Sequence, residues 1–230
     1  HGYSTEEAAR ATGMTADEIS NALQRLHISH APSPSPGRIK VLPYPGGRHP
    51  RLGFLEGAVD PRRDTKLSVF APWEGGGHVV VDVPEAVWSS LGLTYLAHAH
   101  VQTIWERDGI QLEPVEWSAR ADGSWQMLRS LPNGIAMGVR ARAGRDHVAF
   151  RWWVRNGTSN TLGNVHAQVC TMLGRAPGFE SPSSGSKVMD PPFAAASTAD
   201  GQRWVITAWD SFQRGWDNPR VPCKIGRAHV

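Results

Sequence analysis

Alternation between apolar and more polar side chains dominates the middle of this chain. Every second residue is apolar from 135 to 142, and the pattern returns from 148 to 154. A period of two places neighbouring side chains on opposite faces of a strand, so one face is buried and the other is partly wet. Asn133-Gly134, between two such runs, is a strong signal of a β-hairpin. These features predict antiparallel strands.

Further strand-like runs lie on both sides of this region, at residues 67–69, 78–83, 93–101, 112–117, 125–131, 203–209 and in a stretch that ends at Leu173. The strands from Trp125 to Leu173 are predicted to form a four-stranded meander, which fits one sheet of a sandwich. Residues 38–224 are therefore predicted to fold as a mainly β, antiparallel β-sandwich. Residues 174–192 read as a long loop that is functional or disordered.

The first 30 residues predict a helical hairpin instead. Ser4 with Glu7, and Thr15 with Glu18, have the spacing of two capping boxes. Residues 31–37 alternate proline with small residues, which favours an extended linker. The single buried-type cysteine of the strand region, Cys170, is expected to be a free thiol.

The helical hairpin is similar in spacing to the helix-turn-helix of bacterial regulators. A DNA-reading helix usually carries excess positive charge, because it meets phosphates. Residues 1–30 hold four acidic and two basic side chains, and the whole chain carries a net charge of only +3. We therefore expect no nucleic-acid partner and assign the hairpin a packing or tethering role.

The two ends give separate expectations. Residues 225–230 (Ile-Gly-Arg-Ala-His-Val) resemble one reading frame of a sequencing adapter, so we expect them to be an artefact at the end of a fragment cut from a longer reading frame. No run of about 18 apolar residues is present, so no membrane span is expected. Localisation and oligomeric state are left open.

His98 and His100 form the sharpest candidate metal site. On a strand, residues two apart point to the same face, so both imidazoles could bind one divalent ion. Glu106, Glu113 or Glu116 could complete the set, although the spacing departs from the cupin His-x-His motif. The alternative is a pair of ordinary hydrogen-bonded histidines. The sequence itself requires no cofactor.

An unusual loop at residues 43–51 is the second candidate. Its glycines allow close approach of a ligand, and Arg48, His49 and Arg51 supply donors for carboxylates, phosphates or sugar hydroxyls. A proline-shaped turn with solvated charges is the alternative. Ten tryptophans, Trp105 among them, add aromatic faces that can pack against sugar rings, although most tryptophans are core residues.

Residues 148–173 resemble the central strands of galactose-mutarotase-like β-sandwiches, in which a strand ends in Asn plus a small polar turn and the next strand carries a histidine. The resemblance implies a supersandwich fold. The superfamily's histidine falls near Gln168 or Val169, with His166 a few residues earlier, so little activity is carried over. From Arg38 onward the chain also resembles uncharacterised bacterial proteins.

Three functional hypotheses follow. The first is a carbohydrate-recognising or carbohydrate-processing sandwich that uses Arg48, His49, Arg51, His98, His100 and Trp105. A second is a metal-dependent enzyme centred on His98 and His100. The third is a non-catalytic interaction domain.

Overall fold

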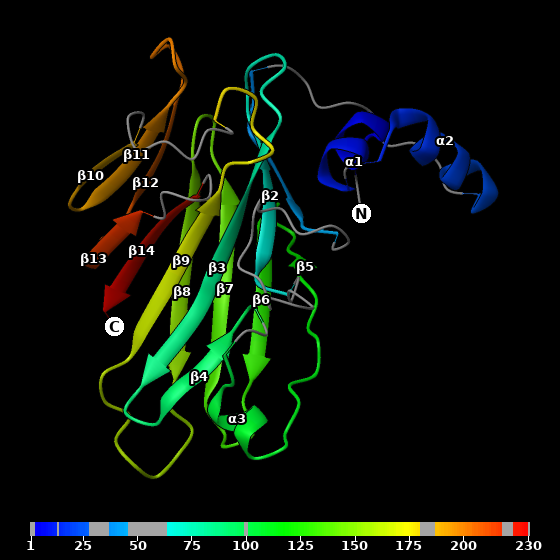
Figure 1. Ribbon diagram of the computed structural model, residues 1–230. Coiled ribbons are helices and arrows are strands. Elements are labelled where there is room, and N and C mark those ends of the chain that lie inside the picture. The colour runs from blue at the N-terminus through cyan, green and yellow to red at the C-terminus, as the bar shows by residue number, and fades with distance from the viewer. Residues whose placement is uncertain are drawn as a thin grey trace.

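The structure is a computed structural model that describes residues 3–12, 14–27, 37–45, 64–98, 101–179, 187–217 and 223–229. It is mainly β, with antiparallel sheets and a few short helices, as the alternation predicts (Figure 1). Within these ranges, none of the helices has the length and apolar character needed to cross a membrane.

The described strands form three sheets. In the described part of the chain the largest, here called the main sheet, has seven strands in the order β1-β2-β3-β9-β14-β13, with β4 also paired to β3. These strands are β1 (Lys40–Pro43), β2 (Lys66–Phe70), β3 (His78–Ser89), β4 (Gly92–Leu96), β9 (His166–Met172), β13 (Phe212–Asp217) and β14 (Cys223–His229).

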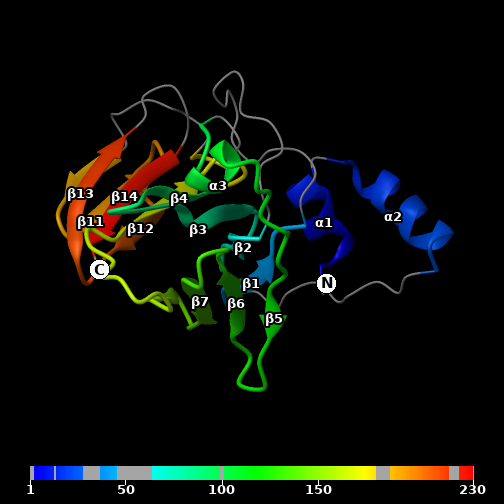
Figure 2. The same cartoon turned by 90° about the horizontal axis from the view of Figure 1, so that it is seen from below.

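The meander sheet has the order β5-β6-β7-β8, and the small sheet the order β10-β11-β12. Their strands are β5 (Ser118–Ala119), β6 (Trp125–Ser130), β7 (Ala136–Ala143), β8 (Val148–Arg155), β10 (Lys187–Asp190), β11 (Phe193–Ser197) and β12 (Trp204–Ala208). Figure 2 shows the meander sheet as a second layer below the main sheet. The molecule is therefore layered like a sandwich.

One core joins the layers. Leu67 and Val81 of the main sheet share a buried cluster with Met127 and Val139 of the meander sheet. Ala196 of β11 belongs to the same cluster, so the small sheet covers the same face of the main sheet. Contact between the alternating apolar faces holds the layers together.

The predicted meander is correct for three strands and wrong for the fourth. β6, β7 and β8 are antiparallel neighbours. β9 instead crosses to the main sheet, where it lies between β3 and β14. Local alternation reports that a strand is buried on one face, but both layers offer such a face.

The Asn133-Gly134 hairpin is confirmed. Gly134 has φ 88° and donates its N–H to Leu131 O at 3.0 Å, and Leu131 N–H bonds Ile135 O at 2.7 Å. The positive φ explains the glycine. Cys170 is confirmed as a fully buried thiol that forms no disulfide with another described residue.

Three predicted segments need correction. Residues 112–117 are irregular, because Pro114 cannot donate to a ladder, and only the short β5 follows. The predicted strand 93–101 ends at Leu96, and a Thr103–Glu106 capping box starts α3 (Ile104–Arg107). Inside the predicted loop 174–192 lies β10.

The N-terminal helices are confirmed as α1 (Thr5–Thr12) and α2 (Ala16–Arg25) with both capping boxes formed. Tyr3 Oη donates to Pro43 O at 2.6 Å, and Glu7 pairs with Lys40 at 2.7 Å. These contacts attach α1 to β1, which agrees with a tethering role.

The chain's last residues also take part in the main sheet. Residues 225–229 belong to β14, where Ile225 pairs with Cys170 of β9 and with Trp216 of β13. The backbone pairing does not bear on the origin of these residues, so their assignment as an adapter sequence stays a prediction.

Candidate functional site

A buried polar cluster, here called the polar junction, lies where β2 and β4 meet along β3. β2 pairs with the first half of β3 and β4 with the second half, and a bulge interrupts β3 between Asp82 and Ala86. Val83 N–H bonds Thr65 O at 2.9 Å, and Ala97 N–H bonds Glu85 O at 2.8 Å. The junction consists of Asp64, Thr65, Lys66, Asp82, Glu85, Tyr95, His98, Arg129 and Gln168.

Its first half is organised around Asp82. The Lys66 ammonium lies 2.9 Å from Asp82 Oδ2, and neither side chain is exposed. Thr65 Oγ1 donates to Asp82 Oδ1 at 2.6 Å. Beside it, Asp64 accepts a hydrogen bond from Tyr95 Oη at 3.0 Å and forms an ion pair with Arg129 of the meander sheet. The junction therefore also links the two layers.

Its second half is organised around Glu85. The two carboxylate oxygens of Glu85 accept hydrogen bonds, one from His98 Nε2 at 3.1 Å and the other from Gln168 Nε2 at 2.6 Å. A carboxylate only accepts, so Nε2 carries the imidazole proton. Burial lowers the pKa of His98 below its ordinary value, and the bond to Glu85 opposes that shift. His98 is therefore neutral at pH 7.

Two carboxylates of the junction are paired with cations, Asp82 with Lys66 and Asp64 with Arg129, whereas Glu85 is held by hydrogen bonds from His98 and Gln168. Lys66 supplies a positive charge next to Asp82, which lies 3.6 Å from His98 Nε2. Among the described residues, no three histidine, cysteine, aspartate or glutamate side chains are grouped to hold a metal ion. The sequence analysis placed His98 on a strand, but β4 ends at Leu96, two residues earlier. The metal site of His98 with His100 stays a prediction.

Of the other predicted ligand residues, the structure describes only Trp105. Arg48, His49, Arg51 and His100 lie outside the described residues. Trp105, on α3, is 6% exposed and donates its indole N–H to Thr94 O at 2.8 Å. It packs in a core cluster with Tyr95 and Met137. The structure therefore presents no exposed ring face of Trp105 to a ligand.

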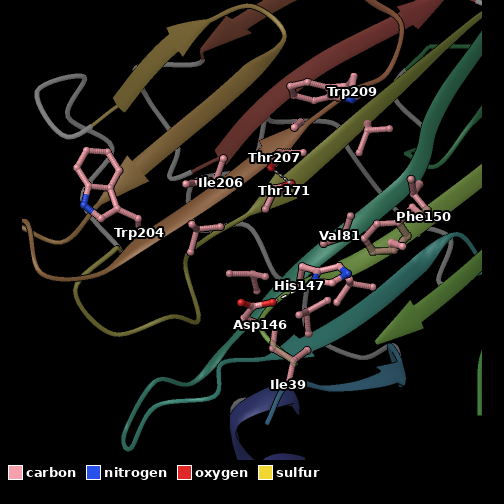
Figure 3. Close-up of a pocket in the computed structure, with 18 of the residues that line it drawn as sticks. Ile39, Val81, Asp146, His147, Phe150, Thr171, Trp204, Ile206, Thr207 and Trp209 are labelled. Carbon is pink, nitrogen blue, oxygen red and sulfur yellow. Dashed lines mark hydrogen bonds and ion pairs between the residues drawn. The ribbon is translucent and has the colours of Figure 1, made fainter. Parts of the chain in front are cut away.

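A cavity of about 580 Å³, here called the β8–β12 groove, opens elsewhere. Its floor is formed by main-sheet side chains such as Val81, Val83 and Val169. One rim is β8 with the turn before it, and the other is β12 with the residues that follow. Figure 3 shows Thr171 of the floor hydrogen-bonded to Thr207 of β12, a contact of 3.3 Å. No residue of the polar junction lines this groove.

The groove is a gap in the second layer of the sandwich. Within the described residues β8 pairs only with β7, and no further backbone hydrogen bond is made by residues 148–155. Alternate residues of an edge strand direct their N–H and C=O groups away from the neighbouring strand. The β8 edge therefore presents polar backbone groups beside an apolar floor.

Aromatic side chains line the groove. Phe150 and Trp152 point inward from β8, while Trp73, Trp204 and Trp209 belong to other segments of the lining. Trp204 is 46% exposed, and its indole N–H is fixed by a 3.0 Å bond to Gly201 O. The tryptophan content predicted aromatic faces that could bind a ligand, but the sequence could not tell which rings are exposed.

The pair Trp152 and Trp153 shows how strand geometry divides these rings. Trp152 faces the core between the layers, whereas the Trp153 ring lies over Gly138 on the other face of the meander sheet. Their opposite orientation is the one predicted for adjacent strand residues.

A scan against protein-family models finds no match for this chain, and searches of the curated proteins and of the solved structures find none. The similarity to galactose-mutarotase-like sandwiches therefore stays a prediction. The functional argument that follows depends on the described residues alone.

Proposed function

We propose that this chain is a non-catalytic interaction domain that binds an extended polypeptide segment in the β8–β12 groove. One observation carries the proposal, namely the edge of β8, which pairs with no described strand except β7 and lies next to an apolar floor. An added strand satisfies the backbone groups of such an edge, and its alternate side chains point into the cavity below. This is recognition by β-strand addition.

The dimensions of the groove support this mode of binding. Its volume of about 580 Å³ falls in the range of ligand pockets, about 300–1,000 Å³. The valines of the floor accept apolar side chains. Ile206, on the β12 rim, is 64% exposed and offers further apolar surface to a bound segment.

The polar junction supports a binding role over catalysis. Its one histidine is neutral and 1% exposed, and its carboxylates are engaged by Lys66, Arg129 and Gln168. General acid–base catalysis needs a group within reach of substrate. The groove lining and the junction share no residue, so the junction supplies no proton carrier to the groove, and the titratable groups of the lining are His147 and two aspartates.

A displayed library of random 12-residue peptides tests the proposal. Selection on the purified chain should enrich peptides with alternating apolar residues, and binding should slow hydrogen exchange at amides of β8. Val169→Lys places a charge in the floor and should abolish the enrichment. Leu128→Lys, at a 59% exposed position of β6 away from the groove, is the matched control.

The same selection can refute strand addition. The proposal fails if no peptide is enriched, or if the enriched peptides bind the Val169→Lys variant equally well. It also fails if binding leaves exchange of the β8 amides unchanged. Circular dichroism of both variants establishes that they are folded before binding is compared.

Carbohydrate recognition is the second candidate, favoured by the fixed and half-exposed ring of Trp204. Aromatic faces pack against the C–H faces of sugar rings. A panel of neutral oligosaccharides, followed by tryptophan fluorescence, tests it with the Trp204→Ala variant. Binding that this variant removes, without protection of β8 amides, favours the sugar over the peptide.

A further inference from the structure

We infer that the polypeptide segment bound in the β8–β12 groove is basic, with Lys or Arg side chains flanking an apolar stretch. The inference rests on the proposed function and names the chemistry of the partner. Charge complementarity between the groove lining and the segment carries it.

The ionised side chains of the lining are acidic. Asp146 and Asp210 line the groove, and among the described lining residues there is no lysine or arginine. His147 is the remaining titratable group there, and its Nδ1 lies 3.0 Å from Asp146. That hydrogen bond lowers the pKa of Asp146 below its ordinary value, so Asp146 stays a carboxylate at neutral pH.

Two arginines lie near the groove without belonging to its lining. Arg203, near β12, holds its guanidinium 5.7 Å from the ring centre of Trp73. Arg145 precedes Asp146 in the turn and lies outside the lining, and its charge helps to keep Asp146 ionised. Both aspartates are exposed, so they are accessible to the side chains of a bound segment.

The position of the acids follows from the strands. Asp146 comes two residues before β8 begins, and Asp210 two residues after β12 ends. In Figure 3 Asp146 lies beside Ile39. Trp209, which precedes Asp210 in the sequence, lies in a different part of the groove, beyond Thr207. The two aspartates therefore belong to opposite rims of the groove, and a segment bound between the rims would lie between them.

Two blocked synthetic peptides, Lys-Val-Thr-Val-Thr-Val-Thr-Lys and its counterpart with Glu at both ends, test the inference. The lysine peptide should bind roughly tenfold more tightly, as two exposed ion pairs allow. In the Asp146→Asn, Asp210→Asn double variant this preference should disappear. Asp122→Asn, an exposed acid outside the groove lining, should preserve it.

The outcomes separate the inference from the proposed function. Equal binding of both peptides, unchanged by the double variant, overturns the basic partner and leaves strand addition intact. If neither peptide binds, the clones from the displayed library decide: a basic excess among them supports the inference, and its absence overturns it. A library without enriched clones removes the proposed function itself.

Discussion

The Lys66 ammonium and the Asp82 carboxylate lie 2.9 Å apart with no exposed surface on either side chain. The register of β2 against β3, in which residue 66 pairs with residue 82, brings them together. Burying one such charge alone is strongly unfavourable, whereas a hydrogen-bonded pair is tolerated. The ion pair therefore ties the polar junction to the correct pairing of these strands.

Asp82→Asn should lower the free energy of unfolding by about 3–5 kcal/mol, because it leaves Lys66 as a buried charge without its counterion. Urea unfolding followed by circular dichroism measures the change. Asp122→Asn is the matched control, since it breaks a 2.6 Å ion pair with Arg140 at the surface and should have little effect. Equal stability of the two variants would contradict the role of the buried pair.

Stability should fall as the pH decreases below about 6.5, the ordinary pKa of histidine. The pKa of His98 is lower in the folded chain than in the unfolded chain, so the unfolded chain binds more protons in this range. The stability that neutral His98 contributes is present above the unfolded pKa and is lost as the pH falls toward the folded pKa.

Urea unfolding at several pH values between 5 and 8 measures this dependence. His98→Gln should flatten the slope, whereas His147→Gln, at an exposed position, should leave it as in the parent chain. A parent-like slope in His98→Gln would assign the pH dependence to other groups.

Gly138→Ala should destabilise the meander sheet by about 1–3 kcal/mol, because the new Cβ would overlap the Trp153 ring and approach Leu128 Cδ2 to 2.8 Å. Thermal unfolding measures the loss. At Gly163 an added Cβ meets only Ser90, at 4.0 Å, so Gly163→Ala should be nearly neutral. A neutral effect at Gly138 would mean that the Trp153 ring can move aside.

Trp105→Phe should lower the free energy of unfolding by about 1–3 kcal/mol, since it removes the bond to Thr94 O and part of a buried ring. Trp204→Phe, at an exposed ring, should cost much less. Unfolding in urea compares the two. If Trp105→Phe instead keeps its stability and loses oligosaccharide binding, the ligand role predicted for Trp105 gains support.

The alternation of residues 135–154 was sufficient to predict strands and the mainly β class, and the Asn133-Gly134 dipeptide predicted the hairpin. Each of these depends on residues close together in sequence. The same holds for the helical hairpin, whose two capping boxes span four residues each. β9 joins the main sheet because it pairs with β3, which is far away along the chain. Local alternation does not report such a pairing, so the prediction wrongly added β9 to the meander.

Of the residues in the polar junction, the sequence analysis identified only His98. A signal for its partners was present, because Lys66 and Asp82 are charged residues inside apolar strand runs, where burial requires a partner. Their proximity depends on strand register, which the sequence pattern does not supply. The β8–β12 groove was not predicted, since an unpaired strand edge is a property of the assembled sheets.

The pairing of β3 with β9 also bears on how the chain folds during synthesis. Val80 pairs with Met172, and the whole meander sheet is encoded between them. Such distant contacts form slowly, because a long loop must be closed before they are gained. One edge of β3 therefore stays without its partner until β9 has been synthesised, whereas the hairpin of β6 and β7 can form as soon as both strands have been synthesised. A stalled or shortened product that ends before β9 would expose this apolar strand and aggregate.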